Sequence, residues 1–368
     1  MNNWYQISNV AEVDSPSLLI YPDRVRENVR RMIAIAGRAE RLCPHVKTHK
    51  LPQITRILLD AGITHFKSST IAEAEMVTQA GAENVLLAHQ PVGPKLERLV
   101  QLIKKFPETT FSIIADNYIS IHEISAAGMD AEIKIRVLLD IDGGMGRTGI
   151  PAGDEAFELY RTMTSLPGIE AGGLHIYDGN LSDSDVNERK RKCDLAFAPM
   201  VSLRERILKA GLPCPRLVAG GTPTFPIHAL RQNVQCSPGT CVLWDESYGS
   251  RCRDLDFLHA ALVLTRVISK PGQNRLCLDL GHKSIASENP HPRVVFFDLP
   301  DAKAVIHSEE HLVIETTKAA EFSVGSVLYG IPWHVCPTVA LHSEAVMVEN
   351  GLATEKWQIE ARKRRINI

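Results

Sequence analysis

Short apolar runs alternate with amphipathic stretches from residue 17 to about residue 245. The amphipathic stretches, such as 51–61 and 184–210, carry apolar residues at the spacing of surface helices. Gly62 and Gly211 each stand just past such a stretch, where a glycine commonly ends a helix. The apolar runs are residues 41–45, 64–68, 84–89, 110–116, 133–142, 169–177, 216–219 and 234–243. Eight strands with intervening helices predict an α/β fold, a (β/α)8 barrel of the TIM type, and favour it over an open doubly wound sheet.

The pattern changes after about residue 255, where short β-rich runs are separated by turn residues. These runs are residues 260–268, 275–279, 293–297, 311–316, 326–329 and 346–349. They predict a second, mainly β domain. We expect residues 17–255 to form the barrel, and residues 1–16 together with 256–368 to form the β-rich domain.

Composition argues against nucleic-acid-binding, membrane-spanning and disulfide-rich proteins. The 41 Lys and Arg residues nearly balance 43 Asp and Glu residues, which argues against a nucleic-acid partner. No apolar stretch reaches the roughly 18 residues of a membrane span, and the first residues are polar, unlike a signal peptide. The eight cysteines are scattered without a CxxC pair. Reduced thiols and a cytoplasmic location are therefore expected.

The segment Pro44-His45-Val46-Lys47-Thr48-His49-Lys50 ends the first apolar run. Catalytic residues of such barrels lie at the carboxyl ends of the strands. A lysine there, with cationic neighbours and partial burial, suits a Schiff-base nucleophile because both effects favour the neutral amine. A solvated surface lysine is the alternative, and the rest of the chain decides against it.

Two glycine- and threonine-rich clusters follow the seventh and eighth predicted strands. Glycines let backbone N–H groups approach an anion, and these loops are the usual phosphate site of such barrels. The clusters contain Gly220, Gly221, Thr222, Gly239 and Thr240. Residues 144–149 match GxGxxG, but they follow the fifth strand rather than opening a dinucleotide fold. We interpret that loop as one that directs Arg147 into the site.

The late segment Trp333-His334-Val335-Cys336-Pro337 offers a second chemical pair. If this segment is a strand, His334 and Cys336 share one face and can bind one metal. Nitrogen and thiolate ligands together favour zinc. A chance pairing in a β domain is the alternative, because two ligands are too few for a closed structural site.

Together these motifs resemble the D-threonine aldolase / D-serine dehydratase family, over about residues 14–361. The resemblance implies fold-type III pyridoxal-phosphate enzymes with an alanine racemase-like barrel. Lys47 would then bind the cofactor, Arg147 and Tyr177 would contact it, and the glycine and threonine clusters would hold its phosphate. His334 and Cys336 would hold a divalent metal, with zinc favoured and manganese or magnesium also considered. A homodimer that acts on small D-amino acids is implied as well.

Two departures from the family affect which reaction is expected. Aldolases carry His-x-Asp at the metal pair, whereas Cys336 stands here as in the dehydratases. Aldolases also carry Tyr-His-Gly on the sixth strand, whereas this chain has Tyr177-Asp178-Gly179. His175 faces the same side as Tyr177 and could replace the missing base. We therefore expect a lyase for β-hydroxy D-amino acids, with dehydration slightly favoured, D-threonine aldolase activity as the alternative and amino-acid racemisation as a further one.

Overall fold

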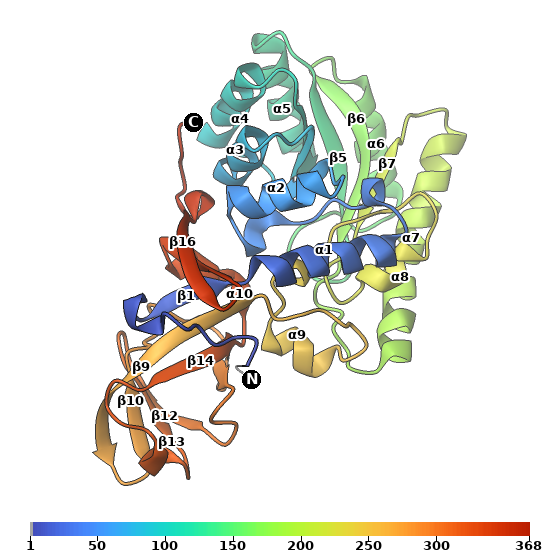
Figure 1. Cartoon of the computed structure of the whole chain (residues 1–368). Coiled ribbons are helices and arrows are strands. Elements are labelled where there is room, and N and C mark those ends of the chain that lie inside the picture. Colours follow the sequence, from blue (N-terminus) through green and yellow to red (C-terminus); the bar gives the residue numbers. More distant parts are fainter. Residues whose placement is uncertain (1–2) are drawn as a thin grey trace. The chain divides into compact units, whose positions relative to one another are not determined.

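The computed structural model describes residues 3–368, which divide into two compact units. The barrel unit comprises residues 30–47, 52–239 and 363–368. The β unit is the rest of the described chain. Figure 1 colours the chain from blue to red along the sequence, so that the green part belongs to the barrel unit and the orange part to the β unit.

Parallel strands form the centre of the barrel unit and hydrogen-bond in chain order. They are β2 (His65–Ser68), β3 (Asn84–Leu87), β4 (Thr110–Ala115), β5 (Ile135–Asp142), β6 (Ile169–Tyr177), β7 (Arg216–Ala219) and β8 (Gln235–Cys236). The segment 42–45 closes the ring by two isolated bridges, Leu42 to Cys236 and His45 to Lys67. The predicted barrel is confirmed, although its first strand is present only as bridges and its eighth is two residues long.

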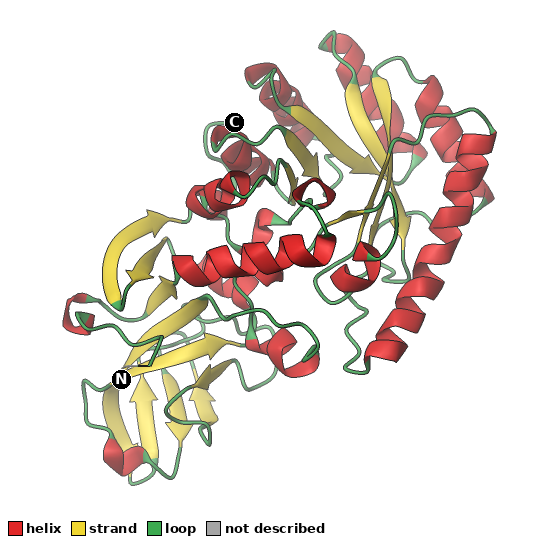
Figure 2. Cartoon of the chain, turned by 45° about the vertical axis from the view of Figure 1, so that its right-hand side comes forward, coloured by secondary structure: helices red, strands yellow, loops and turns green. Residues whose placement is uncertain are grey.

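The interior of the barrel is filled by apolar side chains from several strands, as this architecture requires. One such layer consists of Cys43, Leu86, Ile114, Leu138 and Val218, all buried. The helices of this unit cover the outer side of the strands, as Figure 2 shows in red and yellow. They are α2 (Pro52–Asp60), α3 (Ile71–Gln79), α4 (Pro94–Lys105), α5 (Tyr118–Asp130), α6 (Asp154–Ser165), α7 (Val186–Lys209) and α8 (Phe225–Ala229), while α1 (Pro22–Ala36) is divided between the units.

The β unit is built on one large sheet around the long strand β9. Its strands are β1 (Ser17–Ile20), β9 (Ala261–Gly272), β10 (Arg275–Leu278), β11 (Val294–Phe296), β12 (Lys303–His307), β13 (Leu312–Glu315), β14 (Val327–Pro332), β15 (Glu344–Glu349) and β16 (Leu352–Gln358). Two short helices, α9 (Glu246–Arg251) and α10 (Val335–Leu341), also belong to this unit. The predicted β-rich character is confirmed. Strand β1 pairs with β9 and β15, although its residues start the range predicted for the barrel.

None of the helices in the described residues 3–368 is long and apolar enough to cross a bilayer.

Candidate active site

Lys47 lies in a single 3-10 turn, Val46–Thr48, directly after the bridging segment of the barrel. The turn is held by the side chain of His45, whose Nδ1 accepts a hydrogen bond from the Lys47 N–H at 3.3 Å. The second flanking histidine, His49, is neutral because burial lowers its pKa to about 3. His49 therefore does not supply the positive charge that the sequence suggested beside Lys47.

Lys47 lines a pocket of about 460 Å3 at the carboxyl ends of the strands. A smaller adjoining pocket is lined by Lys47, Arg147, His175 and Tyr177 together. Lys47 Nζ lies 5.4 Å and Arg147 Cζ 5.2 Å from the centre of the Tyr177 ring. The structure thus brings together four residues that the sequence analysis singled out from three different strand ends.

A second lysine of this pocket, Lys67 on β2, was missed by the sequence analysis. Lys67 is only 1% exposed, and burial lowers its pKa to about 8. Its Nζ lies 2.6 Å from the Ser237 hydroxyl and 5.3 Å from the centre of the Tyr177 ring. Ser237 in turn donates to the Gly220 carbonyl at 2.9 Å. Lys67 therefore links β2 to the loop after β7, and its only sequence signal is a lysine within an apolar run.

His175 on β6 lines the smaller pocket, and one of its ring nitrogens is buried without a hydrogen-bond partner among the described residues. Its Nδ1 lies 2.7 Å from Asp140 Oδ1, and its buried Nε2 has no hydrogen-bond partner. Because the Asp140 carboxylate accepts a hydrogen bond from Nδ1–H, the lone pair of the neutral ring lies on Nε2. Burial lowers the pKa of His175, which preserves this neutral form. The Asp140–His175 pair therefore has the arrangement of a general base.

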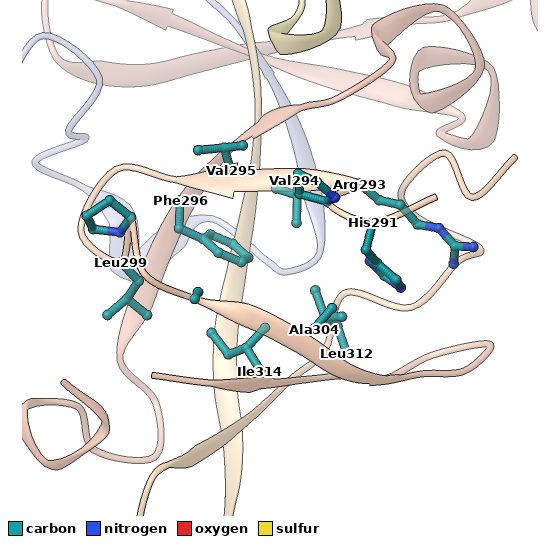
Figure 3. Close-up of a pocket in the computed structure, with 12 residues that line it drawn as sticks. His291, Arg293, Val294, Val295, Phe296, Leu299, Ala304, Leu312 and Ile314 are labelled. Atoms are coloured by element: carbon teal, nitrogen blue, oxygen red, sulfur yellow. The ribbon is translucent and has the colours of Figure 1, made fainter. Parts of the chain in front are cut away.

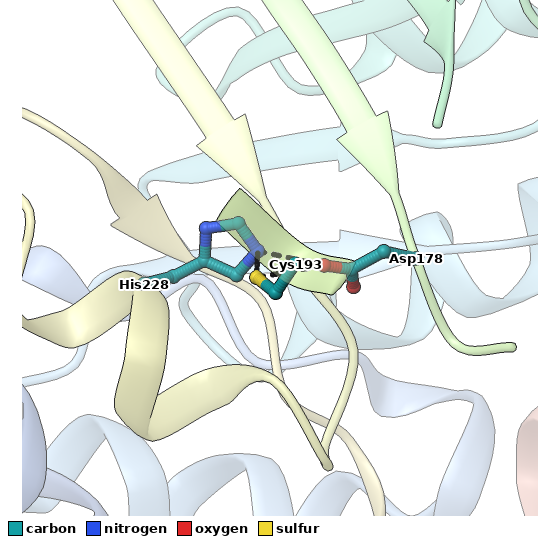
Figure 4. A group of neighbouring side chains, drawn as sticks. All are labelled: Asp178, Cys193 and His228. Carbon is teal, nitrogen blue, oxygen red and sulfur yellow. Dashed lines mark hydrogen bonds and ion pairs between the residues drawn. The ribbon is translucent and has the colours of Figure 1, made fainter. Parts of the chain in front are cut away.

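Asp178 does not face the Lys47 pocket but a buried network behind the loop after β7. Its Oδ1 accepts hydrogen bonds from the Gly221 N–H at 2.9 Å and from the Thr224 hydroxyl at 2.7 Å. Its Oδ2 accepts from His228 Nε2 at 2.7 Å, as Figure 4 shows. Although burial raises it, the hydrogen bond from His228 holds the pKa of Asp178 below its usual value. Asp178 therefore orients the loop and does not replace the base of the aldolases.

Asp178, Cys193 and His228 offer possible metal-ligand atoms within 4.8 Å of one another. Arg231, however, donates to both the Cys193 sulfur and His228 Nδ1 from the other side of the group. Burial raises the pKa of Cys193 to about 12, so its thiol keeps the proton that a metal would displace. We therefore interpret this group as a hydrogen-bonded network rather than a metal site.

The two predicted phosphate loops meet within the barrel unit. The Gly239 N–H donates to Thr222 Oγ1 at 3.2 Å. The N–H of Gly220 donates inward to the Ile176 carbonyl at 3.1 Å, and that of Gly221 is held by Asp178. Thr240 starts a 3-10 turn, Thr240–Val242, of the β unit. The backbone of the loop after β7 is thus held by hydrogen bonds to Ile176 on β6 and to Asp178 directly after it.

Replacing Gly220 by alanine is expected to distort this loop. Gly220 has φ +89°, and a Cβ atom would come 2.6 Å from His228 Cδ2. Both the backbone conformation and the contact disfavour any side chain. We expect the affinity for pyridoxal phosphate to fall, measured by fluorescence titration of the cofactor-free protein. Gly153→Ala is the matched control, because its Cβ would meet open space. Equal affinity in both variants would contradict this account of the loop.

His334 and Cys336 do not lie on a strand, which corrects the sequence prediction. Strand β14 ends at Pro332, His334 caps helix α10, and Cys336 lies in its first turn. Proline is tolerated in a first helical turn, so Pro337 does not prevent this helix. The two side chains still meet: burial lowers the pKa of His334, but hydrogen bonds to Cys336 and Glu288 outweigh it and raise the pKa to about 9.

Glu288 contacts the other side of this pair. Its carboxylate is bonded to His334 Nδ1, while Cys336 Sγ lies 3.3 Å from the Thr48 hydroxyl and 3.8 Å from that of Thr240. A carboxylate on one ring nitrogen is the usual arrangement behind a metal-binding histidine. An imidazole and a thiol held in this way suit a divalent metal of the zinc type.

The β unit also contains a pocket of about 120 Å3, drawn in Figure 3. Its labelled side chains include Val294, Phe296, Leu312 and Ile314, which belong to the buried core of the unit. His291 and Arg293 stand at one side of it. The pocket is a gap in an apolar core, and we assign no chemistry to it.

The chain was compared with known proteins. The family model described as the alanine racemase N-terminal domain matches residues 20–245, and the putative serine dehydratase domain matches residues 260–348. The chain is 31% identical over 360 residues to D-threonine aldolase of Arthrobacter sp, covering 96% of this chain and 94% of that protein. It is 30% identical over 216 residues to D-threo-3-hydroxyaspartate dehydratase of Delftia sp., covering 58% and 56%. The crystal structure of D-threonine aldolase from Filomicrobium marinum matches with a TM-score of 0.88 and 28% identity, covering 96% and 97%.

The fold and the pocket therefore define a lyase that depends on pyridoxal phosphate. The residues fit this cofactor, since a lysine, an arginine, a tyrosine and the unpaired Nε2 of His175 line one pocket. The chain belongs to the family with an alanine racemase N-terminal domain, and within it to the branch of D-threonine aldolase and D-serine dehydratase. The resemblance drawn from the motifs is confirmed.

Proposed function

We propose that this lyase acts on β-hydroxy D-amino acids and that dehydration to a keto acid and ammonia is its main reaction. The single observation that carries the proposal is the pocket shared by Lys47, Arg147, His175 and Tyr177. Cys336 at the metal pair supports dehydration, because the dehydratases of the family carry cysteine where the aldolases carry aspartate.

Lys47 is the residue we assign to hold the cofactor and to take the proton from Cα of the substrate. Bound pyridoxal phosphate supplies an electron sink for bond breaking at Cα. Arg147 and Tyr177, which lie close to each other in the pocket of Lys47, orient the ring of the cofactor. The loops at Gly220–Thr222 and Gly239–Thr240 hold its phosphate. His334 and Cys336 bind the metal, which we propose to be zinc and which supplies Lewis acidity.

Aldol cleavage to glycine and an aldehyde is the second candidate, and the Asp140–His175 pair favours it. This reaction needs a base for the proton of the β-hydroxyl group. The neutral His175 lines the pocket of Lys47, and its buried Nε2 has a lone pair that no described residue uses. D-threonine aldolase is also among the most similar proteins found, at 31% identity.

Product analysis with D-threonine and D-serine tests the proposal. The purified protein is supplied with pyridoxal phosphate and zinc, and the products are separated by chromatography. Ammonia with a keto acid supports the dehydratase, whereas glycine with acetaldehyde from D-threonine establishes the aldolase. Appearance of the L-enantiomer alone would contradict both and indicate a racemase.

The metal pair predicts a role for Glu288 that can be measured without turnover. Glu288→Gln is expected to weaken zinc binding about 10–100-fold, because partners behind a metal-binding histidine have effects of this size. Zinc affinity is read by competition with a chromophoric chelator. Glu309→Gln is the control, since Glu309 is exposed and pairs with Lys283 instead. A Glu288 variant with unchanged zinc affinity would show that the carboxylate does not support the metal.

We also propose that the protein is a homodimer, as the family resemblance implies. Sedimentation velocity over a dilution series measures the oligomeric state directly. A monomer that keeps full activity would contradict a site completed by a partner subunit.

A further inference from the structure

A second pocket of the barrel unit, of about 440 Å3, adjoins the Lys47 pocket. Both pockets are lined by Ser69 and His89, which follow strands β2 and β3. The two cavities therefore share a wall at the end of the barrel where the chemistry takes place. We call the second cavity the Arg364 pocket, and it is lined by Ser69, Thr70, Ile71, Leu87, His89, Pro91, Lys95, Arg98 and Arg364.

The charges around the Arg364 pocket have one sign. Lys95, Arg98 and Arg364 line it, and none of its described lining residues is a carboxylate. Glu73, in the first turn of helix α3, is buried and accepts hydrogen bonds from the N–H and hydroxyl of the lining residue Ser69. Its carboxylate is thus hydrogen-bonded to the segment that leads into helix α3. A concave site lined by cations alone attracts anions and raises their local concentration.

The backbone of the last residues of the chain is held beside this pocket. The guanidinium of Arg98 donates to the Ile368 carbonyl at 2.6 Å and to the Arg364 carbonyl at 3.1 Å. The fully buried carboxylate of Glu75 accepts hydrogen bonds from the N–H of Asn367 at 3.2 Å and of Ile368 at 3.3 Å. A buried carboxylate would lose these partners if the segment left, so the segment is held firmly. The backbone that carries Arg364 is therefore held beside the pocket.

We propose that the Arg364 pocket binds a carboxylate or phosphate group, carried either by the far end of the substrate or by a separate small anion. Arginine and lysine are the residues that recognise these groups. For the substrate, the inference rests on the proposed lyase function and gives it a class: β-hydroxy D-amino acids with an anionic end beyond Cβ. If the pocket binds a separate anion, the inference does not depend on the proposed lyase function.

The first test measures binding alone, so that it does not depend on turnover. Glutarate and inorganic phosphate are titrated by calorimetry into the protein loaded with pyridoxal phosphate. The variant Lys95→Gln/Arg364→Gln removes two cations of the pocket, and Lys104→Gln/Lys363→Gln removes two exposed cations outside it. We expect the first variant to bind at least about 10-fold more weakly than the wild type, and the second to bind like the wild type. Equal binding by all three proteins, or no binding by the wild type, would overturn the proposal.

The second test separates the two sources of the anion. β-Hydroxy-D-glutamate and β-hydroxy-D-glutamine differ only in the charge at the far end. If the substrate carries the anion, the wild type has the lower KM for the glutamate, and the pocket variant loses this preference. If glutarate or phosphate binds but both substrates have equal KM, the pocket holds a separate anion. Failure of both substrates to react would reject the lyase function, while the calorimetric result would still decide on the pocket.

Discussion

Replacing Lys47 by alanine is expected to abolish covalent attachment of the cofactor and to reduce turnover at least about 10²–10⁴-fold, the usual contribution of a general acid or base. The amine is the residue assigned both to bind the cofactor and to take the Cα proton. Borohydride reduction of the loaded protein, followed by peptide mass spectrometry, locates the attachment. In the wild type we expect the label on the peptide that contains Lys47.

Two further lysines give this experiment its controls. Lys50 belongs to the same histidine-rich segment and has φ +55°, a conformation that asparagine tolerates. Lys50→Asn is therefore expected to keep the label and most of the activity. Lys67 lines the same pocket as Lys47, with a pKa lowered to about 8 by burial. A label on Lys67, or a Lys47→Ala protein that is still labelled, would contradict the assignment.

Much of the fold could be predicted from the sequence because its signals are local. The apolar run 169–177 corresponds to strand β6, and the stretch predicted as a helix at 184–210 corresponds to α7 within two residues. The spacing of apolar residues predicts the type of such an element, and glycines mark where it ends. The pairing of β1 with β9 could not be read in this way, because it joins residues more than two hundred positions apart.

The candidate site was predictable where a motif carries the chemistry and not where burial does. Lys47, Arg147 and the glycine loops stand at strand ends, and the barrel places strand ends together. Lys67 was missed because nothing in the sequence distinguishes a lysine inside the barrel from one on its surface. The His334–Cys336 pair was predicted on a strand because residues two apart share one face of a strand. The same spacing also fits the start of a helix, where the structure places it, and the sequence does not distinguish the two.

Asp178 shows the same limit most clearly, since its role depends on contacts with residues 43 to 50 positions away. Its position suggested a lost catalytic histidine. The structure instead gives a chain of contacts from Asp194 through Arg231 and His228 to Asp178 and on to the Gly221 N–H. The guanidinium of Arg231 can only donate, so His228 Nδ1 must accept this hydrogen bond. His228 Nε2 then carries the proton and donates a hydrogen bond to Asp178.

Asp178→Ala is therefore expected to lower the free energy of unfolding by about 3–5 kcal/mol, because it takes the acceptor from the buried donors of Gly221, Thr224 and His228, at about 1–3 kcal/mol for each donor left unsatisfied. Asp178→Asn keeps the shape but can turn an amide donor towards the N–H of His228. It should cost about 1–3 kcal/mol. Because the Gly221 N–H loses this acceptor only in Asp178→Ala, that variant should also bind pyridoxal phosphate more weakly, whereas Asp178→Asn keeps an oxygen for it. Urea denaturation of the cofactor-free protein and cofactor titration measure the two effects separately.

Asp194→Asn is the matched control at the exposed end of the same network. The Asp194 side chain is 46% exposed, so its pair with Arg231 should contribute no more than about 1 kcal/mol. If Asp178→Ala and Asp194→Asn had equal stability, the buried network would not hold the loop. If Asp178→Ala were destabilised but bound the cofactor with unchanged affinity, Asp178 would support the barrel without positioning the phosphate loop. Loss of both properties in Asp178→Ala alone is the result that the hydrogen bonds to Gly221, Thr224 and His228 predict.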